Sequence, residues 1–317
     1  MEFYLEDVFK KSGLPTVTFV EPVDFSKLVV ALRAKGRSVV VEGPSGIGKT
    51  TAVKSALERA KMQDEFLNLS ARKAADVSKI EELFSKNPKG NILIDDFHKL
   101  SAAIQKKIAD QVKIAADEER EDVNIVIVGI NDCGRRLVHF ADDVTNRVDF
   151  FRLETNPRES ILDLISKGES ALNININTKS EIADASGGSF YLAQLLCYEM
   201  CVKGGITETQ RDHVFIDKSF EQIQNSVWRD LDNRFGERTV IFCKGPKFQS
   251  AGRAPYLHLL HWLSRRNEWS LSIRDELRTE SKMRGSVGQI VDKGYLADHI
   301  EKHPDIRERL KNLPLSA

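Results

Sequence analysis

The eight residues from Gly43 to Thr50 constrain the fold of this chain more than any other feature. They read Gly-Pro-Ser-Gly-Ile-Gly-Lys-Thr and fit the pattern G-x-x-x-x-G-K-[ST]. An apolar run, residues 38–42, precedes them, and a helical pattern, residues 50–60, follows. Glycines let successive backbone N–H groups turn toward a phosphate, and the start of the helix adds positive charge. This context predicts a phosphate-binding loop rather than a glycine-rich turn that binds nothing.

Within such a loop the residue types have separate tasks. We expect the ammonium group of Lys49 to reach the β- and γ-phosphates of a nucleotide, and the hydroxyl of Thr50 to ligate Mg²⁺. The predicted nucleotide-binding residues are Gly43, Pro44, Ser45, Gly46, Ile47, Gly48, Lys49, Thr50 and Thr51.

Five short apolar runs, separated by longer amphipathic stretches, indicate the architecture around the loop. The runs are mostly continuous rather than alternating, which is typical of strands buried on both faces of a parallel sheet. They cover residues 38–42, 66–69, 91–94, 124–128 and 148–153. Helices are predicted between them at residues 50–60, 76–86, 101–119 and 135–146.

The third of these helices has the clearest pattern. Apolar residues recur every three or four positions from Ile104 to Ala115, and Ser101 stands where an N-cap is expected. Strands that alternate with such helices predict a doubly wound α/β domain with a parallel sheet, the P-loop NTPase fold.

Two carboxylates follow the third predicted strand. Because a parallel strand ends at the same edge as the phosphate loop, we expect Asp95 to support Mg²⁺. Asp96 then lies near the γ-phosphate and orients or deprotonates the attacking water. The alternative for both residues is a solvated carboxylate without a metal or catalytic role.

Two further catalytic candidates flank the last predicted helix. Asn131 follows the fourth strand, where an amide can hydrogen-bond the γ-phosphate or the water; a simple turn residue is the alternative. Arg147 precedes the fifth strand, where an arginine can stabilise transition-state charge on a neighbouring subunit's nucleotide. A surface or structural arginine is the alternative, and Arg135 and Arg136 are weaker candidates for the same task.

The pattern changes after residue 156. We expect an ATPase-like core over residues 1–155, a small helical domain over 156–205, and a C-terminal domain over 206–317. In the last of these, helices at 218–233, 255–266, 271–278 and 287–293 precede a turn and a small hairpin near Gly294. Three helices followed by a hairpin predict a winged-helix-like domain.

Composition excludes several classes of protein. The chain of 317 residues carries 47 basic and 47 acidic residues, so its overall field does not attract nucleic acid or acidic membrane. The first residues are acidic, which is untypical of a secretory signal, and no apolar run spans a bilayer. The four cysteines lack metal-site spacing, which favours reduced thiols. We expect a cytoplasmic protein that binds no membrane.

Taken together, the phosphate loop, the Asp95–Asp96 strand end, Asn131 and Arg147 resemble the AAA+ ATPases. Residues 18–22, Thr-Phe-Val-Glu-Pro, are similar to the segment that contacts adenine in that superfamily. Residues 183–192, Ala-Asp-Ala-Ser-Gly-Gly-Ser-Phe-Tyr-Leu, resemble the lid pattern of the STAND signalling ATPases. In STAND proteins and in the Orc/Cdc6-like initiators, a helical lid and a winged helix follow the core.

The resemblance implies ATP and Mg²⁺ as cofactors and hydrolysis of ATP to ADP and phosphate. The chain also departs from the family: Ser189 and Phe190 stand where many lids carry an arginine, and Asp96 is shorter than the usual glutamate. Both departures favour slow hydrolysis and a switch over a fast motor.

Three functions remain open at the level of sequence. The leading hypothesis is a molecular switch, in regulation or defence, that acts through nucleotide-dependent homo-oligomers or a partner effector protein. The alternative is an Orc/Cdc6-like ATPase that binds DNA through residues 255–300, with Arg284, Ser286, Gln289 and Lys293 on its recognition helix. A P-loop kinase for a small molecule is the third.

Overall fold

The computed structural model describes residues 2–43, 46–130, 134, 137, 148–245, 254–265 and 271–302. The chain divides into two compact units. The sheet unit is Val20–Glu154, and the helical unit combines Met1–Phe19 with Thr155–Ala317. The first 19 residues therefore group with the helical unit and not with the core, a position that the sequence pattern did not indicate.

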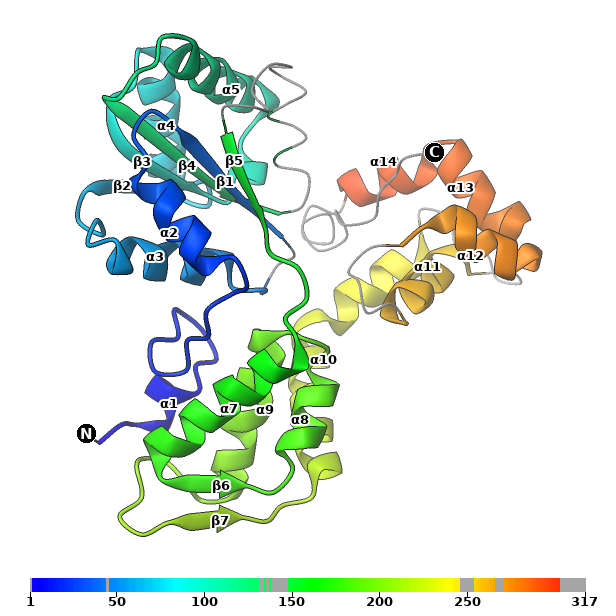
Figure 1. The fold of residues 1–317 in the computed structure, drawn as a ribbon. Helices are drawn as coiled ribbons and strands as arrows, with labels where there is room; N and C mark the ends of the chain where they lie inside the picture. The colour runs from blue at the N-terminus through cyan, green and yellow to red at the C-terminus, as the bar shows by residue number, and fades with distance from the viewer. Residues whose placement is uncertain are drawn as a thin grey trace. The chain divides into compact units, whose positions relative to one another are not determined.

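A parallel sheet of five strands forms the centre of the sheet unit (Figure 1). The strands are β1 (Ser38–Glu42), β2 (Phe66–Ser70), β3 (Gly90–Asp95), β4 (Val123–Gly129) and β5 (Val148–Arg152). Their order in the sheet is β2-β3-β4-β1-β5, and each neighbouring pair is parallel. The predicted fold class and all five predicted strands are confirmed.

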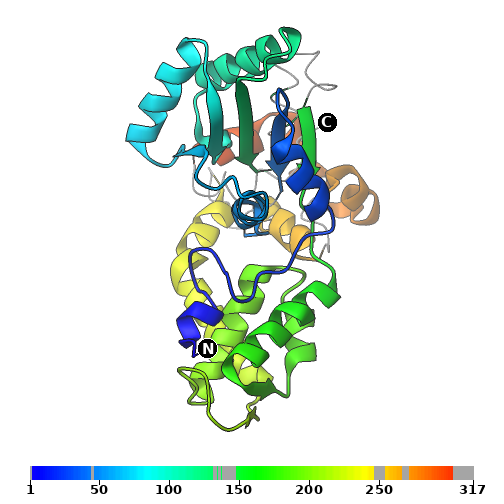
Figure 2. The same cartoon turned by 60° about the vertical axis from the view of Figure 1, so that its left-hand side comes forward.

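Helices cover both faces of this sheet (Figures 1 and 2). The pair α2 (Phe25–Arg33) and α3 (Lys49–Arg59) lies on one face, and the pair α4 (Ala74–Ser85) and α5 (Ala102–Asp117) lies on the other. A short helix, η1 (Phe97–Lys99), precedes α5. Every second residue of the central strands packs under α4 and α5. The apolar stripe of α5 is buried, and the Ser101 hydroxyl accepts the Ile104 N–H, as predicted.

The first part of the helical unit consists of α1 (Leu5–Val8), α7 (Arg158–Leu172), α8 (Lys179–Ala185) and α9 (Phe190–Lys203). α7, α8 and α9 lie within residues 156–205, where the sequence predicts a small helical domain. Two strands, β6 (Ile174–Ile176) and β7 (Val214–Ile216), form a parallel pair that the sequence did not predict. Runs of three residues are too short to show a strand period, which explains the omission.

The second part begins with α10 (Phe220–Lys244), which runs well beyond the predicted end at residue 233. It continues with α11 (Pro255–Ser264), α12 (Ile273–Thr279), η3 (Ser281–Met283), η4 (Arg284–Gly288), α13 (Gln289–Asp292) and α14 (Tyr295–Lys302). These helices share one apolar core, in which Trp262 is fully buried. Trp228 of α10 is among the exposed large hydrophobic residues, and Trp269 lies outside the described residues.

The predicted hairpin near Gly294 is replaced by a helix. Gly294 adopts φ +72° and ends α13, and α14 starts at the next residue. Leu296 and Ile300, four residues apart, are both buried, so this segment follows a helical period. Among residues 254–265 and 271–302 no strand occurs, and the winged-helix assignment stays a prediction.

Gly168 of α7 provides a test of this packing. A Cβ at this position would lie 2.1 Å from the ring of Phe9, which is fully buried. We expect Gly168→Ala to lower the free energy of unfolding by about 2 kcal/mol, because the ring must move. Gly236→Ala is the matched control, since its Cβ meets only the carboxylate of Asp232, a side chain that can rotate. Equal thermal unfolding of the two variants would contradict this account.

Candidate ATP site at the carboxyl edge of the sheet

The phosphate loop joins the end of β1 to the start of α3, as predicted. A Cβ on Gly43 would lie 2.3 Å from the backbone oxygen of Leu153, so only glycine fits beside the residue that follows β5. Gly46 and Gly48 have φ of +81° and +102°, values that favour glycine. Pro44 and Ser45 lie outside the described residues.

Gly48 is the N-cap of α3, so Lys49, Thr50 and Thr51 form the first turn of that helix. The first N–H groups of a helix have no partner within it and carry the positive end of the helix dipole. The glycine turn and this helix start can therefore hold a triphosphate, with the Lys49 ammonium group beside it.

Thr50 and Asp95, the two predicted Mg²⁺ ligands, are in contact. Thr50 Oγ1 donates a hydrogen bond to Asp95 Oδ2 at 3.0 Å. The contact joins the first turn of α3 to the last residue of β3, so the fold brings together two groups 45 positions apart. A hydroxyl and a carboxylate are oxygen ligands of the kind that Mg²⁺ prefers, and nucleotide phosphates and water complete its shell.

Burial raises the pKa of Asp95 above its ordinary value, and the negative charge of Asp96 adds to the rise. The hydrogen bonds from Thr50 and from the Asp96 N–H, and the charge of Lys49, oppose it. A partly buried carboxylate beside a second one is stabilised by a cation, which supports the assignment of Mg²⁺ here. Among the described residues, no group of three or more His, Cys, Asp or Glu side chains forms another metal site.

Asp96 is engaged by an arginine that the sequence did not single out. Arg72 Nε donates to Asp96 Oδ2 at 2.6 Å and Arg72 Nη2 donates to Asp96 Oδ1 at 2.9 Å, a two-bonded pair. The Asp96 side chain is only 13% exposed, and its backbone has φ +58°, which is uncommon outside glycine. The carboxylate is therefore held in one direction at the end of β3.

The strand order explains why Arg72 reaches this position. β2 pairs with β3, with Ser70 opposite Asp95, and the Ala71 N–H continues the pairing to the Asp95 backbone oxygen. Arg72 is the next residue along the chain. A basic residue two positions beyond a strand end was visible in the sequence, but nothing there showed which strands are neighbours.

Glu42 is a second carboxylate that sequence reasoning missed. It ends β1 directly before the loop, and its Oε2 accepts the backbone N–H of Gly134 at 3.0 Å. Glu42 thus ties the end of β1 to the segment that follows β4.

The two remaining catalytic candidates, Asn131 and Arg147, lie outside the described residues. The strands beside them are described. β4 ends at Gly129, opposite Glu42, so it ends at the same edge as the phosphate loop. β5 begins at Val148, opposite Ser38, the first residue of β1, which is the other edge of the sheet.

Comparison with known proteins agrees with this geometry. Residues 39–148 match the family of ATPases associated with various cellular activities, AAA. No curated protein sequence matches the chain. Among solved structures, Orc1 of Aeropyrum pernix, in complex with DNA, has a TM-score of 0.52 at 13% identity, covering 84% of this chain and 77% of that one. RuvB of Thermotoga maritima has a TM-score of 0.49 at 16% identity, covering 78% and 88%.

The parallel sheet, the phosphate loop and the match over residues 39–148 show the AAA+ P-loop NTPase fold in the sheet unit. The protein binds ATP with Mg²⁺ and hydrolyses ATP to ADP and phosphate. When bound, Mg²⁺ neutralises charge on the β- and γ-phosphates. Thr50 and Asp95 are the residues that would hold it, and Lys49 is the residue that would bind the phosphates. Among the described helices, none is long and apolar enough to cross a bilayer.

The loop assignment is tested by removing one charge. Lys49→Ala should weaken ATP binding by about a hundredfold or more, because a charged donor to the phosphates is lost. The control is Lys54→Ala, which removes an exposed lysine of the same helix and should leave ATP binding unchanged. Titration calorimetry with ATP–Mg²⁺ measures both, and tight binding by the Lys49 variant would refute the assignment.

Proposed function

We propose that this ATPase is a slow molecular switch that acts through nucleotide-dependent assembly or through a partner protein. The observation that carries the proposal is the two-bonded pair between Arg72 and Asp96. Asp96 is the candidate for orienting or deprotonating the attacking water. While both of its oxygens accept from the guanidinium, the carboxylate is directed toward Arg72 and not toward a water.

In this proposal, Arg72 restrains hydrolysis until it leaves Asp96. While Arg72 is paired with Asp96, hydrolysis is slow and ATP stays bound for long periods. A long-lived ATP-bound state suits a switch, in which the ATP-bound conformation is the active one. The lid sequence supports the same view. The Gly187-Gly188 turn leads into α9 through Ser189, whose hydroxyl accepts the Leu192 N–H, and α9 contains no arginine. The STAND resemblance of this turn motivates the assignment to signalling or defence.

Assembly into homo-oligomers follows from the position expected for Arg147. Arg147 directly precedes Val148 in the sequence, and Val148 lies opposite Ser38, at the end of β1 away from the phosphate loop. We propose that Arg147 acts on the nucleotide of a neighbouring copy, where it would stabilise transition-state charge. Asn131, two residues after β4, is proposed to contact the γ-phosphate or the attacking water of its own chain.

The segment Thr18–Pro22 is proposed to contact the adenine base, on the strength of its resemblance to the AAA+ superfamily. Its two halves belong to different units, because the boundary lies between Phe19 and Val20.

A second candidate is an ATPase that binds DNA through residues 255–300. The solved Orc1 protein that covers 84% of this chain is in complex with DNA, which motivates this alternative. Arg284 and Ser286 lie in η4, and Gln289 begins α13, so the predicted recognition helix is helical.

The role of Arg72 is tested by turnover. We expect Arg72→Ala to raise ATP hydrolysis several-fold, and Asp96→Asn to lower it by about a hundredfold or more while ATP binding persists. Arg37→Ala, which removes an exposed arginine paired with Asp149, is the control and should change neither. If Arg72→Ala instead lowers turnover as Asp96→Asn does, Arg72 positions Asp96 for catalysis and the proposed restraint is wrong.

Measuring the mass of the protein in solution tests whether it acts through assembly or through DNA binding. We expect the purified protein to assemble on addition of ATP–Mg²⁺ in the absence of DNA, measured by light scattering. A monomer that associates with a short duplex only when ATP is present would favour the DNA-binding candidate. Binding that falls steeply with added salt would support the same conclusion.

A further inference from the structure

The strand β7 leaves one aromatic side chain at the surface of the helical unit. β6 and β7 form a two-stranded sheet, and among the described residues no strand lies beyond either of them. Ile216 is buried and Val214 is half-buried, whereas Phe215 between them is 74% exposed. Successive side chains of a strand point to opposite faces, so Phe215 lies on the outer face of this sheet. A single exposed ring is common at protein surfaces, but this ring lies beside two further features.

The first feature is an open backbone edge. In a parallel pair, alternate residues of each strand bond to the partner strand. On β7 these are Val214 and Ile216. The Val214 N–H donates to Asn173 O at 3.2 Å, and Ile216 O accepts the Asn177 N–H at 3.4 Å. The N–H and C=O of Phe215 therefore point away from β6, where an added strand can pair with them.

The surface around this edge is preformed. Asn173, the C-cap of α7, donates from Nδ2 to Gln210 O at 3.0 Å and to Arg211 O at 3.3 Å. Its Oδ1 lies 3.2 Å from His213 Nδ1, and the His213 ring packs edge-on against Phe215, with ring centres 5.0 Å apart. The loop and the ring are thus held before any partner binds, which reduces the entropy lost on binding.

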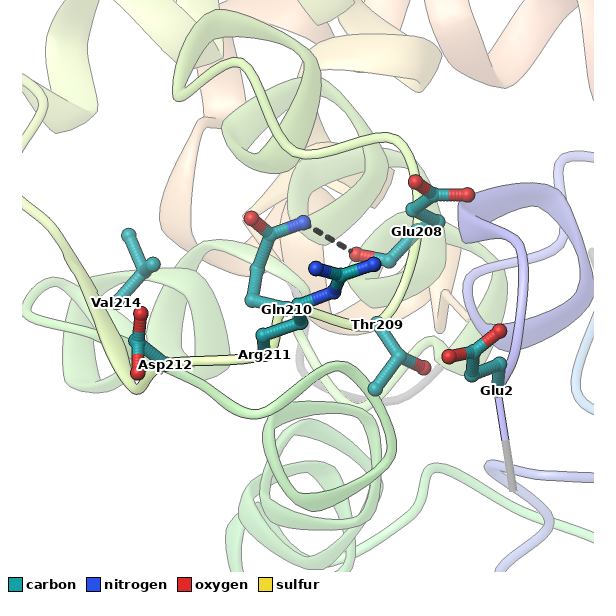
Figure 3. Close-up of a pocket in the computed structure, with 7 residues that line it drawn as sticks. All are labelled: Glu2, Glu208, Thr209, Gln210, Arg211, Asp212 and Val214. Atoms are coloured by element: carbon teal, nitrogen blue, oxygen red, sulfur yellow. Dashed lines mark hydrogen bonds between the residues drawn. The ribbon is translucent and has the colours of Figure 1, made fainter.

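The second feature is a polar depression that adjoins the same strand (Figure 3). It has a volume of about 490 Å³ and is lined by residues 208–212, Val214 of β7 and Glu2. Glu2, Glu208 and Asp212 supply three carboxylates to this lining, and Arg211 supplies one cation. Among the described residues, none of the three carboxylates forms an ion pair. The net negative charge attracts a cationic side chain and repels nucleic acid and acidic lipid.

We propose that β7 is a docking edge for an extended, basic segment of a partner protein. The segment adds as a strand beyond β7 and pairs with the backbone of Phe215. One of its apolar side chains packs on the Phe215 ring, and a lysine or arginine enters the depression beside Val214. Main-chain pairing gives affinity, and the two side-chain contacts give specificity. This edge lies in the helical unit and the phosphate loop in the sheet unit, so the inference goes beyond the proposed switch and does not depend on it.

Fluorescence anisotropy with labelled peptides of about eight residues tests this inference on the whole chain. The basic probe alternates lysine with valine, and the acidic probe alternates glutamate with valine. We expect the basic probe to bind with a Kd of about 10–100 μM and the acidic probe to bind about tenfold or more weakly. Methylation of alternate backbone nitrogens of the basic probe should abolish binding, because the probe then loses the donors that pair with β7.

Two changes at the edge should each weaken binding of the basic probe by about tenfold. One is Phe215→Ser, and the other combines Glu208→Gln with Asp212→Asn. The matched controls are Tyr295→Ser and Glu237→Gln, which remove an exposed ring and an exposed carboxylate elsewhere in the helical unit. Both controls should bind the basic probe as the wild type does. All these side chains are exposed, so the variants should unfold at the temperature of the wild type.

Every other outcome counts against the inference. Equal binding of the basic and acidic probes would overturn it, as would no binding of the basic probe at about 1 mM. Unchanged binding of the methylated probe would exclude strand addition. Unchanged binding by both edge variants would place the probe elsewhere. If the wild type dimerises with rising concentration and Phe215→Ser does not, the occupant is a second copy of the chain and the partner segment is refuted. If one edge variant fails to fold, the other decides.

Discussion

The hydrogen bond between Thr50 and Asp95 is the contact on which the arrangement of the ATP site depends. It joins a helix start to a strand end, and both groups are the expected ligands of one cation. The strands beneath are apolar on both faces, so polar groups gather at their ends, where they are only partly buried. The parallel direction of all five strands places the ends of β1, β3 and β4 at one edge. The phosphate loop, Asp95 and the Arg72–Asp96 pair follow from that geometry.

Much of this edge could be predicted because its signals are local. The loop string, the strand before it and the helix after it lie within about twenty residues, and the fold confirms them. The N-cap at Ser101 and the apolar stripe of α5 are also recognised from residues that lie close together in the chain. Asp95 could be placed because any carboxylate after a buried parallel strand meets the loop at the same edge. Arg72 could not, because its role depends on β2 lying beside β3, and the strand order is a long-range property.

The other differences between the predicted and the observed structure also arise from long-range packing. The strands β6 and β7 pair across some 40 positions of the chain, and strands of three residues leave no period in the sequence. The glycine before α14 favours a turn and a hairpin in the sequence. The burial of Leu296 and Ile300, which identifies the helix, depends on the core that surrounds them. The N-terminal segment reads as part of the core by its position in the chain. It belongs to the helical unit because Phe9 and Thr18 find their partners there.

The length of the helix α10 limits which insertions and deletions the helical unit can accept. Its buried residues, Ile223, Val227 and Phe242, lie near its two ends, and none of residues 228–241 is buried. Twenty-five residues correspond to about 37 Å of helix, so α10 acts as a rigid spacer. The number of residues in α10 fixes the rotation, about the helix axis, between the buried face near its start and the buried face near its end. Insertion of seven residues, close to two turns, would preserve that angle, whereas insertion of two would rotate one face by about 200°. Insertions and deletions in this helix are therefore tolerated when they amount to nearly whole turns. Its exposed residues can be replaced more freely.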